Sequence, residues 1–252
     1  MGELDMQGKW VKKLILIIVC TIFCISFLIT IRQNTKQNTI NSTTKALLEK
    51  MEKKDIAAIR EEIKIVQKEN SNKVDIKSLE KRFQGTIIIG DSIAEGLINY
   101  QILSSDIVIP VRGASVDRIQ SQIQEAITYQ PETVFLEFGM NDLERFWGEP
   151  SLFIDSYRAR INELKEGIKD VDIYINNILP VQQVAINKTP YNAQYKEYNE
   201  AIKTMCKEMK LTYIDNDDIL QAIEDSYEQD GIHPKYAYYP RWANHMADVA
   251  GL

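Results

Sequence analysis

Cysteine and histidine are scarce in this chain of 252 residues, which contains three cysteines and two histidines. Cys20 and Cys24 both lie in an apolar run near the amino terminus, so only Cys206 remains for the rest of the chain. A disulfide framework or a cysteine-rich zinc site is therefore excluded there. No other metal site of recognisable spacing occurs, and we expect no metal and no cofactor.

Positive charge is also in short supply. The 30 lysine and arginine residues are outnumbered by 36 aspartates and glutamates, and the net charge of -6 argues against a nucleic-acid partner. Phosphate-binding loops of the Walker or G-x-G-x-x-G type are missing, as is the G-x-S-x-G elbow of α/β-hydrolases. The remaining composition, 26% charged and 44% hydrophobic, is that of a globular protein.

One long apolar run, residues 14–31, contains no charged residue over 18 positions. As a helix it would be about 27 Å long, close to the hydrocarbon thickness of a bilayer. No A-x-A-like cleavage site follows it, and no small residue precedes Cys20 or Cys24 as lipoprotein processing would require. We therefore expect residues 14–31 to be an uncleaved, single-pass membrane anchor behind a short tail, residues 1–13.

The segments on either side of this anchor indicate its orientation and its connection to the rest of the chain. Basic residues are nearly tied across the span, but those before it (Lys9, Lys12 and Lys13) cluster more tightly, which favours a cytoplasmic amino terminus and an extracellular remainder. Residues 32–73 are a polar linker and a helical stalk by pattern. The stalk fits a coiled-coil seam for fewer than three heptads, so a homodimer through the stalk, a helix packed on its own domain and a charged spacer all stay open.

Residues 74–252 have the alternating pattern of an α/β domain. Short apolar runs predict five strands, at residues 86–89, 106–110, 133–138, 171–175 and 211–214. Amphipathic segments predict helices at residues 93–103, 116–129, 152–168, 192–209, 217–223 and 236–249, with a long loop at 176–190. This alternation predicts a three-layer sandwich with a five-stranded, mostly parallel sheet, in which ligands bind at the carboxyl edge of the strands.

A serine stands at the point where the first of these strands ends. Ser92 follows Gly90 and Asp91 and begins the next amphipathic segment. Free N–H groups and the helix dipole favour developing negative charge at such a position, which suits a nucleophile. The alternative is that Asp91 or Ser92 only caps the helix and takes no part in a reaction.

Four separated stretches combine glycine with polar residues: residues 90–96 (G-D-S-x-x-x-G), Gly113, residues 139–142 (G-x-N-D) and residues 230–233 (D-x-x-H). In order and spacing they resemble the sequence blocks of the SGNH (GDSL) hydrolase family. The resemblance covers roughly residues 85–250 and implies a flavodoxin-like SGNH fold. It also implies a triad in which Ser92 is the nucleophile, His233 the base and Asp230 the residue that orients the base. The backbone N–H groups of Ser92 and Gly113 and the amide of Asn141 would form the oxyanion hole.

Some of these residues also have structural explanations. His233 lies among turn residues, although the other histidine, His245, is placed inside a predicted helix with no carboxylate at matching spacing. Asn141 fits a turn as well as an oxyanion donor. Asp91 and Asp142 are predicted to hold their loops through bonds from side chain to backbone.

The expected function is that of a membrane-tethered serine esterase facing outward from the cell membrane. Its partner would be an acylated carbohydrate or another small ester, with acetyl as the expected acyl group and envelope or exported glycans as the expected substrates. An O-acyltransferase that moves the acyl group to a glycan hydroxyl would share the same acyl-enzyme. A non-catalytic interaction module on a hydrolase-like fold is a further alternative.

Overall fold

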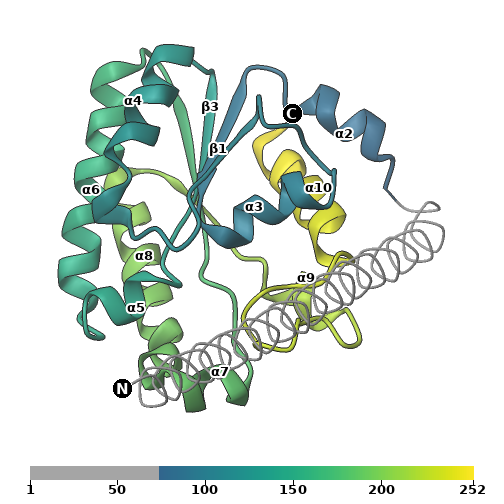
Figure 1. The fold of residues 1–252 in the computed structure, drawn as a ribbon. Coiled ribbons are helices and arrows are strands. Elements are labelled where there is room, and N and C mark those ends of the chain that lie inside the picture. Colours follow the sequence, from purple (N-terminus) through teal and green to yellow (C-terminus); the bar gives the residue numbers. More distant parts are fainter. Residues whose placement is uncertain (1–73) are drawn as a thin grey trace, which may run out of the picture. The chain divides into compact units, whose positions relative to one another are not determined.

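The computed structural model describes residues 74–252, which fold into a five-stranded sheet with helices on both faces (Figure 1). The strands are β1 (Thr86–Gly90), β2 (Val108–Pro110), β3 (Thr133–Glu137), β4 (Asp172–Asn176) and β5 (Thr212–Ile214). Their order is β2-β1-β3-β4-β5, and each neighbouring pair is parallel. The predicted α/β fold with five strands is confirmed, and the sheet is wholly parallel where a mostly parallel one was predicted.

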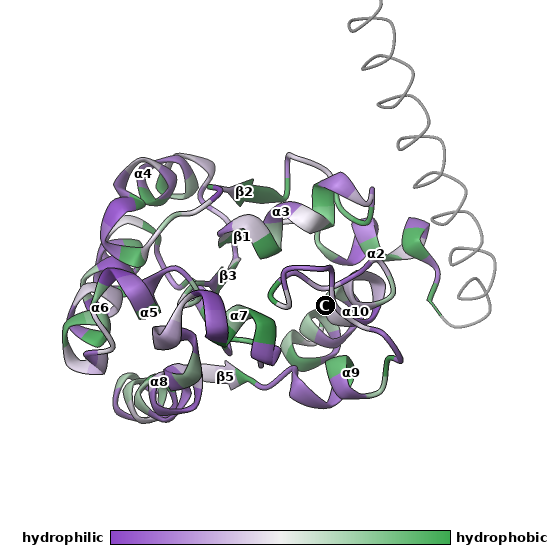
Figure 2. Ribbon diagram, turned by 60° about the horizontal axis from the view of Figure 1, so that its bottom comes forward, coloured by the Kyte–Doolittle hydropathy of each residue, from purple (hydrophilic) through white to green (hydrophobic). Residues whose placement is uncertain are grey.

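Two sets of helices complete the three layers (Figures 1 and 2). One face is covered by α2 (Ile76–Arg82), α3 (Ser92–Asn99) and α10 (Tyr238–Ala250). The other face is covered by α4 (Gln120–Tyr129), α6 (Pro150–Gly167) and α8 (Tyr195–Met209). Three shorter helices lie in the connections: α5 (Asp142–Arg145), α7 (Gln183–Lys188) and α9 (Asp217–Gln221).

The central strands explain why the sequence folds around this sheet. Every residue of β1 and of β3 is buried, which matches the uninterrupted apolar runs of strands that are covered on both faces. The two strands pair from Thr86 with Thr133 to Gly90 with Glu137, so their carboxyl ends finish side by side. The loops that follow them are thereby held at one edge of the sheet.

Some predicted helices end earlier in the structure than the sequence pattern indicated. The predicted helix 93–103 stops at Asn99, because Gln101 adopts a left-handed conformation (φ 58°) and the N–H groups of Ile102 and Leu103 turn back to the carbonyl of Leu97. The predicted helix 116–129 is divided into a 3₁₀ turn, Val116–Arg118, and α4.

The long loop predicted at 176–190 is wrong in part, because it contains α7. This helix buries only Ala185, so it offers almost no periodic apolar signal in the sequence. Helices α2 and α5 were not predicted for the same reason, since one or two turns bury few side chains.

The predicted anchor and stalk, residues 14–31 and 32–73, lie outside the described residues. Within residues 74–252, the helices lack the combination of length and apolar character that crossing a bilayer demands.

Candidate active site

Ser92 is positioned by the sharp turn between β1 and α3. A side chain at Gly90 would press on Ala94 and on the backbone of Glu137, which explains the glycine before the turn. Asp91 caps α3, because its Oδ1 accepts the N–H of Ile93 at 2.8 Å. The hydroxyl of Ser92 is left for another contact, and its Oγ lies 2.9 Å from Nε2 of His233.

His233 is held on its other side by Asp230. Nδ1 of the imidazole lies 2.6 Å from Oδ2 of Asp230, while Oδ1 of that carboxylate accepts the backbone N–H groups of Ile232 and His233. Burial alone would raise the pKa of Asp230, but these hydrogen bonds and the nearby imidazole lower it below its usual value. The carboxylate therefore stays ionised, accepts the proton of Nδ1 and leaves Nε2 free to accept the hydroxyl proton of Ser92.

The loop that carries Asp230 and His233 is a short hairpin tied to the rest of the fold. Tyr227 and Pro234 form an isolated antiparallel bridge across its base. The hydroxyl of Tyr227 donates to the carbonyl of Pro180 at 2.6 Å, and the N–H of Gln182 donates to the carbonyl of Gly231 at 2.9 Å. The loop after β4 thus supports the hairpin and holds the imidazole toward β1.

A cavity of about 340 Å³ opens in front of Ser92. Four of the residues predicted for the site line it together, namely Ser92, Gly113, Asn141 and His233, whereas Asp230 stands behind the imidazole. The other lining residues are Ser115, Met140, Glu144, Arg145, Thr189, Asn192 and Ile232. None of these seven was singled out from the sequence, because they come from separate loops that only the fold brings together.

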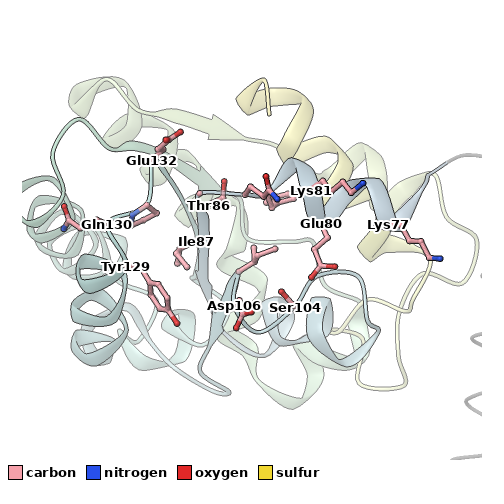
Figure 3. A pocket seen from close by; sticks show the side chains of 15 residues that line it. Lys77, Glu80, Lys81, Thr86, Ile87, Ser104, Asp106, Tyr129, Gln130 and Glu132 are labelled. Atoms are coloured by element: carbon pink, nitrogen blue, oxygen red, sulfur yellow. The ribbon is translucent and has the colours of Figure 1, made fainter.

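A second, larger cavity of about 520 Å³ lies at the opposite edge of the sheet (Figure 3). Its lining includes Lys77, Thr86 and Glu132, which stand at or before the amino ends of the strands or on α2. None of the predicted site residues lines it. The residues predicted for the site therefore gather at the carboxyl edge of the sheet, where parallel α/β folds bind their ligands.

Gly113 has a conformational reason to be glycine. Its φ angle is +70°, a left-handed value that disfavours other residues. A Cβ there would meet no atom within 4 Å, so crowding by neighbouring protein atoms is not the constraint.

Asn141 is oriented by a buried carboxylate. Its Nδ2 donates one hydrogen to Oδ2 of Asp91 at 2.7 Å, and a side-chain amide has a second hydrogen to donate. Because Asn141 also lines the cavity, that second hydrogen is available for a bound oxygen.

Acidic side chains are buried directly behind this edge. Oδ1 of Asp142 accepts the N–H of Val116 at 2.8 Å, and burial raises the pKa of Asp142 to about 8. Asp91 is fully buried as well, and burial raises its pKa. The prediction that Asp91 and Asp142 hold their loops through backbone hydrogen bonds is confirmed.

Glu137 is a residue of this edge that the sequence analysis missed. It is the last residue of β3, it is only 3% exposed, and burial followed by the charge of Asp91 raises its pKa well above the usual value. The signal that could have found it is an acidic residue at the end of a strand that is otherwise apolar (T-V-F-L-E).

Residues 88–240 match the GDSL-like lipase/acylhydrolase family. The chain belongs to this family. Membership makes it an SGNH/GDSL-type serine esterase, as the sequence blocks predicted. No curated protein matches the chain.

Solved structures of other family members and of esterases have the same fold. A GDSL-like lipase from Bacteroides thetaiotaomicron superposes with a TM-score of 0.54 at 15% identity, covering 75% of this chain and 97% of that chain. A carbohydrate esterase family 3 protein from Talaromyces cellulolyticus gives a TM-score of 0.51 at 16% identity, covering 66% and 95%. A variant of the acetyl-xylooligosaccharide esterase Axe2 from Geobacillus gives 0.50 at 17% identity, covering 66% and 94%.

Proposed function

We propose that this GDSL-like acylhydrolase removes short acyl groups, acetyl first among them, from glycans, with Ser92 as nucleophile, His233 as general base and Asp230 as the residue that orients the base. The observation that carries the proposal is the continuous line of contacts from Asp230 through His233 to Ser92, which ends in the cavity. The same division of labour operates in Ser-His-Asp triads on unrelated folds.

The reaction follows from these contacts. Nε2 of His233 takes the hydroxyl proton of Ser92 while Oγ attacks the ester carbonyl carbon, and the imidazolium then gives that proton to the leaving alcohol oxygen. The acyl group is left on Oγ. A water molecule attacks this acyl-enzyme, loses its proton to Nε2, and the acid leaves as Oγ regains a proton. The carboxylate of Asp230 stabilises the imidazolium in both halves of the reaction.

The oxyanion of each tetrahedral intermediate would be bound by the backbone N–H groups of Ser92 and Gly113 and by the free hydrogen of the Asn141 amide. Support comes from the position of all three residues in the lining of one cavity and from the start of α3 at Ser92, where the helix dipole favours negative charge. The loss of one such donor costs on the order of 100- to 1000-fold in rate in comparable enzymes.

A short acyl group is favoured by the size and lining of the cavity. Its volume of about 340 Å³ lies at the small end of ligand sites, and Met140 and Ile232 provide apolar contacts for a methyl group. Two of the proteins with the same fold are a carbohydrate esterase and an acetyl-xylooligosaccharide esterase by description, which supports acetylated glycans as the substrate class.

We place the enzyme at the cell membrane as part of this proposal. The apolar run 14–31 would anchor it once, the basic cluster before the run favours an outward-facing domain, and the stalk would carry any homodimer contact. A reporter fused after Leu252 should be active only outside the cytoplasm, and a reporter that is active in the cytoplasm would overturn the orientation.

The triad is tested with matched variants on p-nitrophenyl acetate. Ser92→Ala and His233→Ala should each lower kcat by a factor on the order of 10⁴ to 10⁶. Asp230→Asn keeps an oxygen for the N–H groups of Ile232 and His233 but turns an amide donor toward Nδ1, so kcat should fall by roughly 10³ to 10⁴ through the wrong imidazole tautomer. Wild-type rates in Ser92→Ala would remove the proposed mechanism.

The substrate is tested by acyl-chain length and by acetate release. The ratio kcat/KM should fall from p-nitrophenyl acetate to the butyrate and octanoate esters, because most of the cavity's lining is polar and a longer chain would gain few apolar contacts. Acetate release from purified envelope glycans is then measured with and without a sugar acceptor. Free acetate in both conditions supports a hydrolase. Acetyl transfer to the acceptor would instead show that the enzyme is an O-acyltransferase.

A further inference from the structure

The feature behind the proposed oxyanion hole that the reaction does not use is the buried pair of Asp91 and Glu137. The two residues meet because Gly90 pairs with Glu137 across β1 and β3, which brings Asp91 next to the end of β3. Both side chains are buried, a Cβ on Gly90 would lie 3.0 Å from Oε2 of Glu137, and the two carboxyl groups interact directly. Two carboxylates in such contact cannot both be ionised, so the pair holds a proton between them.

The hydrogen bonds around the pair identify which oxygen carries that proton. Asp91 already accepts two N–H groups, from Ile93 on Oδ1 and from Asn141 on Oδ2, which is the environment of an anion. Glu137 accepts from the backbone N–H groups of Asp91 and Ala94, but its Oε2 meets no donor within residues 74–252. An oxygen that is buried without a donor is free to carry hydrogen itself.

We propose that Glu137 is a positioning residue for the oxyanion hole: as a neutral acid it donates its proton to Asp91, which remains an anion and fixes the amide of Asn141 toward the cavity. The inference rests on the proposed role of Asn141. Glu137 does not line the cavity, so its effect on the reaction passes through Asp91 and Asn141. Burial and the negative charge of Asp91 raise the pKa of Glu137, which agrees with a neutral acid.

A metal-binding role for these acids finds no support in their arrangement. Within residues 74–252, no group of three or more histidine, cysteine, aspartate or glutamate side chains is arranged to hold a metal ion. Besides Asp91, the titratable groups that interact with Glu137 are Tyr157, Tyr238 and Tyr239. These groups are all acids, which are neutral or negatively charged at any pH, so none supplies a positive charge that would hold Glu137 ionised.

Two substitutions at Glu137 separate a neutral acid from an ionised one. Glu137→Gln reproduces the neutral acid, with an oxygen toward the N–H groups of Asp91 and Ala94 and an N–H toward the carboxylate of Asp91. Glu137→Met has a similar length and no donor. We expect kcat for p-nitrophenyl acetate to stay within about threefold of wild type in Glu137→Gln and to fall roughly 10- to 100-fold in Glu137→Met, with a smaller change in KM. An equal loss in both variants would overturn the proposal.

The path through Asn141 is tested in a second background. When Asn141→Ala has already removed the donor, Glu137→Met should lower kcat by less than about twofold more, because coupled residues are not additive. The same fractional loss in both backgrounds would show that Glu137 does not act through Asn141. Thermal unfolding of each variant accompanies the rates, so that a loss of folded protein is not counted as a loss of kcat.

The proton itself is observed without any measurement of activity. The infrared spectrum of the wild-type protein at neutral pH should contain a carbonyl band of a protonated carboxylic acid that shifts in deuterated water and disappears in Glu137→Gln, besides the band of Asp142, which disappears in Asp142→Asn instead. Absence of this difference would overturn the proposal even if Glu137→Met failed to fold. If the inference alone fails, Ser92→Ala and Asn141→Ala still lose most of their activity. Full activity of Ser92→Ala would remove the proposed function and this inference together, and full activity of Asn141→Ala would remove the proposed oxyanion donor and this inference.

Discussion

Asp142 shows what burial does to a single carboxyl group. Its Oδ1 accepts the N–H of Val116, its Oδ2 meets no donor within residues 74–252, and burial raises its pKa to about 8. In the unfolded chain the same group has its ordinary value, 3.8. The folded protein therefore binds more protons than the unfolded chain between these two pH values, and Asp142 makes the free energy of unfolding fall as pH rises. Its contribution is complete below 3.8 and lost above about 8.

Asp142→Asn should remove this pH dependence while keeping an oxygen for the N–H of Val116. We expect the variant to gain stability relative to wild type between pH 5 and pH 8, as measured by urea unfolding at both pH values. Asp106→Asn, at an exposed position, serves as the control and should run parallel to wild type. If the stability of Asp142→Asn changed with pH by the same amount as that of wild type, the raised pKa of Asp142 would be contradicted.

Single residues also show the limit of reading roles from sequence. Gly113 was predicted from its place in a family pattern, but the reason for the glycine, a φ angle of +70°, is a property of the folded loop. Glu137 went unnoticed because a lone acid at a strand end has no periodic pattern. Its importance depends on Asp91, which is 46 positions earlier in the chain and adjacent only through strand pairing.

At the scale of elements, the packing of α3 on α10 controls where Ser92 stands. Gly96 faces the ring of Tyr239, and a Cβ at Gly96 would overlap the ring atoms. Tyr239 is 2% exposed and has little room to move. The glycine four residues after Ser92 is thus explained by close helix packing, which sets the position of the first turn of α3.

Gly96→Ala should destabilise the domain by about 1–3 kcal/mol through overpacking and should lower kcat, because α3 carries Ser92. Both effects are measured on the same preparation, by urea unfolding and by p-nitrophenyl acetate turnover. Tyr239→Leu in the Gly96→Ala background should recover part of both losses relative to Tyr239→Leu alone. If Gly96→Ala lowers the free energy of unfolding and kcat by the same amounts in the wild-type and in the Tyr239→Leu background, the contact with the Tyr239 ring is not the cause.

Elements that bury several side chains were predicted well, whereas the three short helices α2, α5 and α7 were not. The strands β1 and β3 and the helices α6 and α8 bury several side chains each, so their patterns stand out in the sequence. Helix α7 buries one residue and was predicted as loop. The hairpin with Asp230 and His233 depends on tertiary bonds from Tyr227 and Gln182, which leave no local signature.

For the whole molecule, the sheet, both helical layers and the candidate active site all belong to residues 74–252. One continuous core, from Leu79 on α2 to Ala247 on α10, joins the layers. A domain of this size with its own core has the means to fold alone.

We therefore expect residues 74–252 to unfold in a single cooperative transition and to hydrolyse p-nitrophenyl acetate with the kcat/KM of the full chain. The measurement compares kcat/KM of the fragment with that of the full chain in detergent micelles. The Ser92→Ala variant of each protein serves as the inactive control. An aggregated or inactive fragment beside an active full chain would show that the first 73 residues contribute to the fold or to the site.

The sequence by itself determined the α/β class and the five strands. It also indicated the candidate site residues Ser92, Gly113, Asn141, Asp230 and His233. Both were possible because buried strands and family motifs are local patterns in the sequence. Tertiary structure decided that four of these residues share one cavity with Asp230 behind His233, that Asp91 rather than Ser92 caps α3, and that Glu137 is buried beside Asp91. The physical reason is that hydrogen bonds and burial act between residues close in space, and parallel pairing brings together loops that are far apart in the chain.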